Sequence, residues 1–213
     1  LGTWVTSGVV QEAGLSVAIN GAASIRLTNW FSSLQFNVID PVTFEAWQNR
    51  TITQGTSAPN NMGEGLYGSL DNHPPFASQP AFFSFEYRYT DTAGRRKMMD
   101  FMRDVIPSGH YVVVRNFTLN PAQFNTTTFP VAYAADWAAD EAIHGSGQSL
   151  YHYLKNAGFS GIDSFYRVRP WGLVYKKNDP SFTPKWLVGE GMFDNPTLSV
   201  DCPTPDTVGY ITS

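Results

Sequence analysis

Two segments of the sequence share one hydrophobic pattern: an amphipathic helix, then a glycine, then an apolar strand. In the first, Met98, Met102 and Val105 recur every three or four residues, which places them on one face of a helix. A proline and Gly109 follow and predict the end of this helix before the β-branched run at residues 112–114. We therefore expect a helix that packs through this face onto a buried strand.

The second segment repeats the pattern between residues 150 and 175. Leu150 and Leu154 lie on one helical face, and Ser149 or Ser146 is placed to cap the start of the helix. Gly158 supplies the left-handed residue that commonly ends a helix. The strand that follows, at 173–175, is expected in the same sheet as 112–114. Both segments are typical of scaffold, and neither contains a catalytic set.

The remaining chain divides into strand-like ends and two long polar stretches. Residues 1–21 and 187–213 alternate like short strands, and we expect the two ends to pair with each other and to lead into neighbouring domains. The stretches 52–80 and 120–147 are rich in Gly, Pro and Asn, so they are predicted insertions, with a short helix at 133–143. The 213 residues are expected to form a single folded unit.

The order of these elements is similar to that of a known family. The runs that carry the likeness are 34–43, 83–87, 100–114, 150–158 and 171–176. Together they resemble the interleukin-like EMT inducer family, also called the GG domain, across about residues 22–178 with the two insertions excepted. Members of that family occur in secreted cytokine-like proteins, in the stem of a protein O-mannose N-acetylglucosaminyltransferase and in large multidomain bacterial surface proteins.

The resemblance implies an α+β fold in which two small antiparallel sheets form a sandwich flanked by helices. It implies no enzyme chemistry. We add the expectation that the terminal strands pair around this core, and that the chain is a module of a large secreted or surface protein, of bacterial origin, with a part in adhesion.

Composition narrows the classes of function. Charged residues make up only 15% of the chain, against roughly 25% in typical soluble domains, and aromatic residues also reach 15%. This balance is common in extracellular β-rich modules, so an extracellular or cell-surface location is expected. A net charge of -4 with scattered basic residues argues against nucleic acid, and the short run 95–97 is expected to be a solvated helix face. No run approaches the ~18 apolar residues of a membrane span.

Candidate chemistry is sparse. If 133–143 is helical, Asp136, Asp140 and His144 share one face and could hold a metal or move a proton, although a solvated helix face is the favoured explanation. We expect no metal and no cofactor, because no complete ligand set or nucleophile-base pair is present. The single cysteine, Cys202, is expected to be a small buried side chain. Residues 91–93 fit both a helix cap and a short bacterial O-glycosylation pattern.

Aromatic residues near the insertions are the other resource. Trp47, Tyr67 and Trp137 border or occupy the long stretches and are expected to be exposed, with flat faces on which sugar rings can stack. The sequence therefore predicts a non-catalytic extracellular module that binds a glycan or a partner protein. One alternative is a structural accessory domain of a secreted peptidase or glycosidase. Another is a hydrolase that uses the Asp136, Asp140 and His144 cluster.

Overall fold

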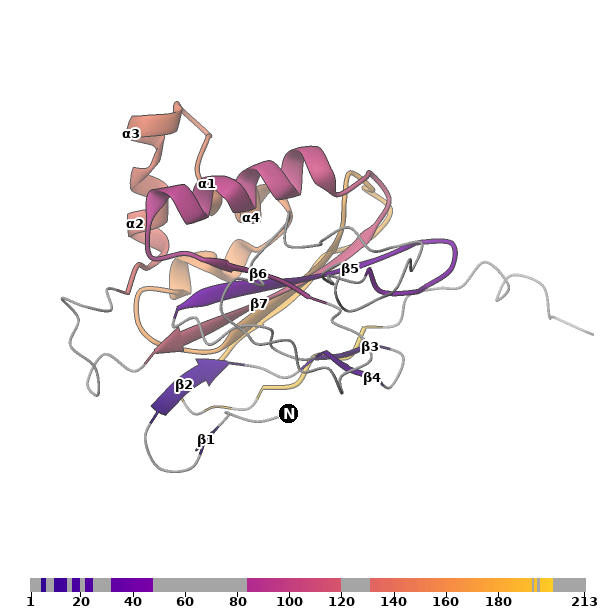
Figure 1. The fold of residues 1–213 in the computed structure, drawn as a ribbon, viewed down its shortest axis with the longest axis horizontal. Helices are drawn as coiled ribbons and strands as arrows, with labels where there is room; N and C mark the ends of the chain where they lie inside the picture. Colours follow the sequence, from indigo (N-terminus) through magenta and orange to yellow (C-terminus); the bar gives the residue numbers. More distant parts are fainter. Residues whose placement is uncertain are drawn as a thin grey trace, which may run out of the picture.

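The chain adopts an α+β fold in which helices cover one face of a single large antiparallel sheet (Figure 1). The computed structural model describes residues 5–6, 10–14, 17–19, 22–24, 32–47, 84–119, 131–192, 194 and 196–200. A separate hairpin, β3 (Val17–Ile19) with β4 (Ala22–Ser24), lies on the side of the sheet away from the helices.

Strand β7 (Tyr111–Leu119) is the centre of the seven-stranded sheet. It pairs on one side with β5 along residues 111–117, and on the other side with β8 along 111–115 and with β2 along 117–119. β6 extends the sheet beyond β5, β9 extends it beyond β8, and β1 pairs with β2. The bounds of these strands are β1 (Val5–Thr6), β2 (Val10–Gly14), β5 (Ser33–Ile39), β6 (Phe85–Arg88), β8 (Trp171–Lys176) and β9 (Lys185–Val188).

The helical layer begins with α1 (Thr92–Asp100), which Asp91 caps by accepting a hydrogen bond from the Gly94 amide at 2.7 Å. The helix continues without a break as a π-helical turn, η2 (Phe101–Val105), so the helix expected over 98–105 is confirmed with a wider last turn. The other helices are α2 (Ala134–Ala139), α3 (Glu141–His144), α4 (Leu150–Asn156) and the 3-10 turn η3 (Ser160–Ser164).

The core lies between this layer and the sheet. Because side chains alternate along a strand, Leu34, Phe36 and Val38 of β5 all face the helices, and all three are fully buried. Phe36 packs edge-on against Phe101 with ring centres 5.7 Å apart. The predicted strands at 112–114 and 173–175 are confirmed as neighbours in one sheet, and Met98 and Met102 are buried against them as expected.

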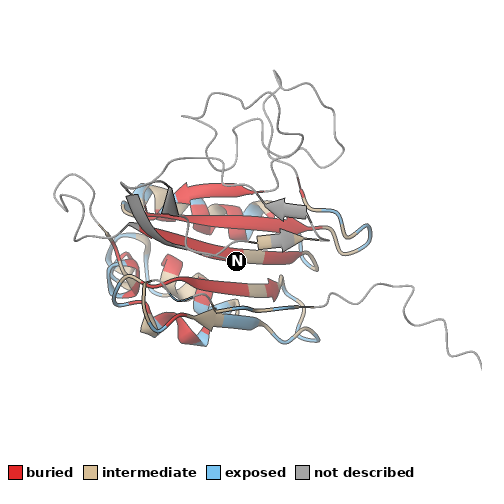
Figure 2. Cartoon of the chain, turned by 90° about the horizontal axis from the view of Figure 1, so that it is seen from below, coloured by how far each residue is buried: buried red, intermediate tan, exposed pale blue. Residues whose placement is uncertain are grey.

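The opposite face of the sheet is also buried, but it is polar. Ser33 donates to Glu86 at 2.5 Å, and the Arg115 guanidinium donates to Gln35 at 2.5 Å. These four side chains are almost fully buried, and Figure 2 shows the central strands buried along most of their length. Burial on both faces explains why β5 has no exposed residue.

Two expectations about architecture are not confirmed. The strands form one sheet and a small hairpin, so the sandwich of two small sheets is not confirmed. The described N-terminal strands pair with each other and with β7, and described residues 189–192, 194 and 196–200 contain no strand. Most of the two chain ends lies outside the described residues, so their predicted pairing stays a prediction. The predicted insertion at 52–80 lies outside the described residues, as do 201–213 with Cys202.

Candidate functional site

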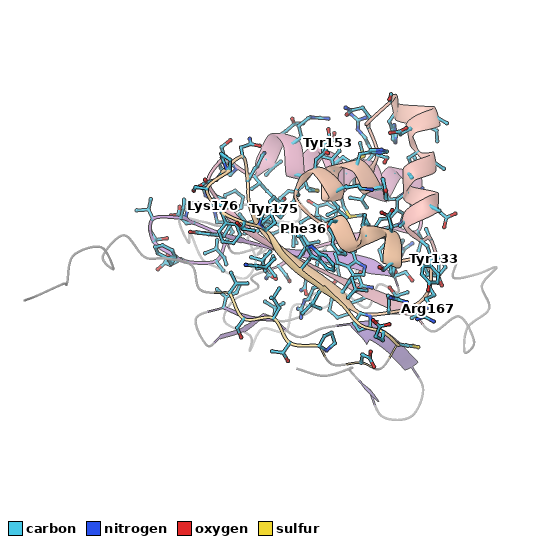
Figure 3. All side chains as sticks on the ribbon, turned by 180° about the vertical axis from the view of Figure 1, so that it is seen from behind. Phe36, Tyr133, Tyr153, Arg167, Tyr175 and Lys176 are labelled. Atoms are coloured by element: carbon cyan, nitrogen blue, oxygen red, sulfur yellow. The ribbon has the colours of Figure 1, made fainter. Side chains whose placement is uncertain are left out.

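A groove of about 830 Å³ lies where the helical layer meets the end of β8. One wall comes from η2 and α4, and the other from the turn that joins β8 to β9. We call it the β8 groove, and its lining includes Arg103, Gln148, Tyr153, Asn156, Tyr175, Lys176, Lys177, Asn178, Asp179, Phe182, Thr183 and Pro184. Figure 3 shows Tyr153, Tyr175 and Lys176 toward this end of β8.

Two local features hold the walls of the groove together. Gly158 ends α4 with a φ of 102°, and a Cβ atom there would lie 2.4 Å from Pro184, so only glycine permits this approach. Lys177 donates through Nζ to the carbonyl of Arg103 at 2.7 Å and to that of Ile106. These carbonyls end the π-helical turn, where a cation is favourable, and burial lowers the pKa of Lys177.

The cations of the groove are each compensated within the protein. Arg103 forms ion pairs with Asp100 at 2.8 Å and with Asp104 at 2.5 Å. Lys176 pairs with Asp179 at 2.8 Å. Hydrogen bonds from Lys176 and from Ser181 lower the pKa of Asp179 to about 2, so this carboxylate stays charged. The groove therefore offers polar groups without a large uncompensated charge.

Tyr175 is the least satisfied polar group of the groove. The side chain is 4% exposed, and its hydroxyl has no hydrogen-bond partner within the described ranges. Burial raises the pKa of Tyr175, so the hydroxyl keeps its proton and remains a donor. Tyr153 and Thr183 also bring hydroxyls to the lining, and Tyr153 donates to Gln148 at 3.1 Å.

The aromatic residues expected to bind a ligand are not surface groups. Trp47 is 5% exposed and packs against Phe85 and His110, with ring centres 6.3 and 5.3 Å away. Trp137 is fully buried and lies 5.3 Å from Phe165. The expectation that these two tryptophans are exposed is wrong, because α2 turns Trp137 into the core and a bridge beside β5 brings Trp47 under the sheet's end. Tyr67 lies outside the described residues.

Asp136, Asp140 and His144 do not form the cluster that their spacing suggested. The helix is interrupted between α2 and α3, and Asp140 forms a buried, two-pronged ion pair with Arg95 at 2.6 and 2.8 Å. Asp136 instead accepts from the backbone amide of Tyr133 at 2.7 Å. Over the part of the chain that is described, no three His, Cys, Asp or Glu side chains are grouped as a metal site. Arg95 was expected on a solvated face, and that expectation is also wrong.

Ser149, His152 and Glu141 form a contact that superficially resembles a hydrolase triad. The Ser149 hydroxyl and a Glu141 oxygen each lie 2.9 Å from the same ring atom, Nδ1 of His152. A triad needs the base to contact its nucleophile and its acid through different nitrogens, so this arrangement cannot perform that relay. Ser149 also accepts from the His152 amide and thereby caps α4, as the sequence predicted.

Sequence reasoning missed the groove because its residues come from separate elements and form no motif. The available signal was the polar run Lys176 to Asp179 directly after an apolar strand. Arg103 and Tyr153 gave none, since each is an ordinary polar residue on an amphipathic helix.

Comparison of the sequence with protein-family models and with curated proteins gives no match, and comparison of the structure with solved structures gives none. The resemblance to the interleukin-like EMT inducer family therefore stays a prediction. None of the helices in the described ranges has the length and apolarity that crossing a membrane requires.

Proposed function

We propose that this chain is a non-catalytic extracellular module that binds a neutral glycan in the β8 groove. The observation that carries the proposal is the groove itself, whose volume of about 830 Å³ lies in the range of small-molecule sites. The buried Tyr175 hydroxyl lacks a partner among the described residues, and a sugar hydroxyl would supply one if the lining side chains move aside to admit it.

The lining suits sugar chemistry. Sugars present many hydroxyls that both donate and accept, and the side-chain amides of Gln148, Asn156 and Asn178 offer both kinds of partner. Phe182 and Tyr153 add aromatic surface against which the apolar face of a sugar ring can pack. Aromatic surface beside a few convergent polar groups is typical of ligand sites.

The charges favour a neutral ligand over an ionic one. Arg103 and Lys176 already have carboxylate partners, and Lys177 is bound to helix carbonyls. An anionic ligand would have to compete with these contacts, whereas a neutral sugar would leave them intact. This groove replaces Trp47, Tyr67 and Trp137 as the proposed binding surface.

The location and the family remain part of the proposal. The low proportion of charged residues and the resemblance to the interleukin-like EMT inducer family support a secreted or surface protein with further domains. The alternative, a structural accessory domain of a secreted hydrolase, requires no ligand in the groove.

The test is a screen of neutral oligosaccharides against the intact protein, followed by calorimetric titration of any hit. Tyr175→Phe separates binding from structure. Removing an unsatisfied buried hydroxyl should leave the thermal midpoint of the protein equal or higher. Losing a ligand contact worth about 0.5–1.5 kcal/mol should lower the affinity for the glycan by roughly 2- to 13-fold. A lower midpoint with unchanged affinity would contradict the assignment.

Tyr153→Phe and Tyr151→Phe form a matched pair on α4. Tyr153 lines the groove, whereas the Tyr151 hydroxyl contacts Asp163 and Lys155 instead. Only the first variant should weaken the glycan. If no neutral glycan binds the intact protein, the proposal fails and the accessory role becomes the better explanation.

A further inference from the structure

Arg169 is a buried arginine whose charge no carboxylate of the described residues compensates. The residue is 5% exposed, yet its guanidinium donates no hydrogen bond to any described residue, and its Nε atom is buried without a partner. No Asp or Glu of the described ranges forms an ion pair with it. Arg95 is equally buried, and there Asp140 accepts two hydrogen bonds. Arg95, whose role is structural, thus has carboxylate acceptors for its guanidinium, whereas Arg169 has none among the described residues.

A second arginine and an exposed tyrosine adjoin Arg169. The guanidinium carbons of Arg169 and Arg167 lie 5.3 and 5.5 Å from the ring centre of Tyr166, which is 64% exposed. Arg167 donates to the carbonyl of Glu190 at 2.9 Å and, like Arg169, has no carboxylate partner among the described residues. Two cations and an exposed hydroxyl therefore gather on one short segment.

The backbone of this segment is held on both sides. The carbonyl of Arg169 accepts from the Asn116 side chain at 2.9 Å, and the carbonyl of Pro170 accepts from the Gly189 amide at 2.8 Å. Phe165, at the start of the segment, is fully buried between Tyr89 and Trp137. The donors are thus presented from a fixed frame, which lowers the entropy lost when a ligand binds.

The arrangement is unfavourable without a counterion. A buried cation costs free energy unless hydrogen-bond acceptors replace its water, and two guanidiniums near one ring repel each other. Contact with the Tyr166 ring offsets part of this cost. An anion that accepts from both guanidiniums would remove the remainder.

We propose that Arg167, Arg169 and the Tyr166 hydroxyl form a binding site for a tetrahedral oxyanion, a sulfate or phosphate group. Planar guanidiniums bind such oxygens in pairs, and a tetrahedral anion has enough oxygens for donors that approach from two sides. The site does not depend on the proposed glycan groove. It adjoins the first residue of β8, whereas the groove adjoins the last, about 17 Å away at the rise of an extended strand. Figure 3 shows Arg167 and Lys176 toward opposite ends of β8.

The experiment follows the arginine Nε–H signals of the intact protein by nitrogen-edited NMR while sodium sulfate or sodium phosphate is added. Sodium chloride at matched ionic strength controls for screening. The signals of Arg167 and Arg169 should shift and saturate, whereas those of the ion-paired Arg95 and Arg96 should not. The two salts in separate titrations show whether sulfate or phosphate is preferred.

Variants complete the test. Arg169→Gln should lower the affinity for the anion about 10-fold or more, as expected for the loss of charge-assisted hydrogen bonds. Arg96 pairs with Asp100 instead, so Arg96→Gln should leave this affinity unchanged. Should Arg169→Gln fail to fold, Arg167→Gln at the exposed position gives the same reading. Shifts that grow linearly without saturation, or that are equal in Arg167→Gln and the unmodified protein, would overturn the proposal.

Discussion

The buried ion pair between Arg95 and Asp140 makes the sharpest prediction about stability. Arg95 belongs to α1, and Asp140 joins α2 to α3, so the pair fixes these helices against each other. Arg95 also donates to the carbonyl of Tyr89 at 2.8 Å. Replacing Arg95 by Ala leaves a buried carboxylate whose remaining side-chain contact within the described residues is the weak one from Thr92 at 3.3 Å.

The expected magnitude follows from the burial. Removing one partner of a buried pair costs about 3–5 kcal/mol, a large part of the roughly 5–15 kcal/mol that stabilises a typical domain. For a chain of this size, 1 kcal/mol corresponds to a change of about 2–4 °C in the thermal midpoint. Arg95→Ala should therefore lower the midpoint by roughly 6–20 °C.

Arg96 provides the matched control, one residue along the same helix. It pairs with Asp100 at 3.0 Å, but both side chains are about 40% exposed. Exposed pairs at this spacing contribute only about 0.3–0.5 kcal/mol, so Arg96→Ala should move the midpoint by a degree or two at most. The double variant Arg95→Met with Asp140→Leu should recover most of the loss, since an apolar pair needs no compensation. Equal midpoints for Arg95→Ala and Arg96→Ala would refute the reasoning.

Three further predictions concern other positions. Gly94→Ala should lower the urea midpoint although alanine favours helices, because its Cβ would lie 2.1 Å from the carbonyl oxygen of Arg88; an unchanged midpoint would contradict this close packing. Trp137→Ala should lower the free energy of unfolding, measured with denaturant, by about 3–5 kcal/mol, and a negligible change would show that this side chain is not buried. Burial lowers the pKa of His110, so the unfolded chain takes up the proton first and stability should fall as pH drops below about 6.5. His110→Asn should show a shallower fall over that range, and parallel midpoint-against-pH curves would exclude His110 as the cause.

The helices and strands could be predicted where a local pattern carries the information. The sequence predicts three such features correctly: the helical face with Met98 and Met102, the cap at Ser149 and the left-handed Gly158. Each depends only on a few neighbouring residues. The order of the strands in the sheet could not be predicted from local patterns, because β2, β5 and β8 all pair with β7 from distant parts of the sequence. A sandwich and a single sheet share the same alternation pattern.

The site was harder than the fold for a related reason. Spacing suggested that Asp140 was available as a ligand, but its role is decided by Arg95, 45 residues earlier. The two tryptophans next to polar stretches are predicted to be exposed, yet both are buried, because large apolar rings are usually buried when the fold places them near the core. The groove needed the actual placement of Tyr175 below α4 and η2, which no periodicity encodes.

The π-helical turn η2 has a consequence for how this helix tolerates changes in length. A π turn contains one residue more per turn than an α-helix, so its wider loop is equivalent to a one-residue insertion. Deleting one residue within 101–105 would restore α-helical hydrogen bonding while the residues that follow keep their helical phase, because the wide turn absorbs the extra residue. Deleting one residue from α1 would instead rotate everything that follows by about 100°. Arg103 would then leave the groove wall and Ile106 would leave the core. The π turn is thus the segment of this helix in which a one-residue deletion leaves the far end in phase, and comparing single deletions in η2 and in α1 would separate the effect of helical phase from that of chemistry.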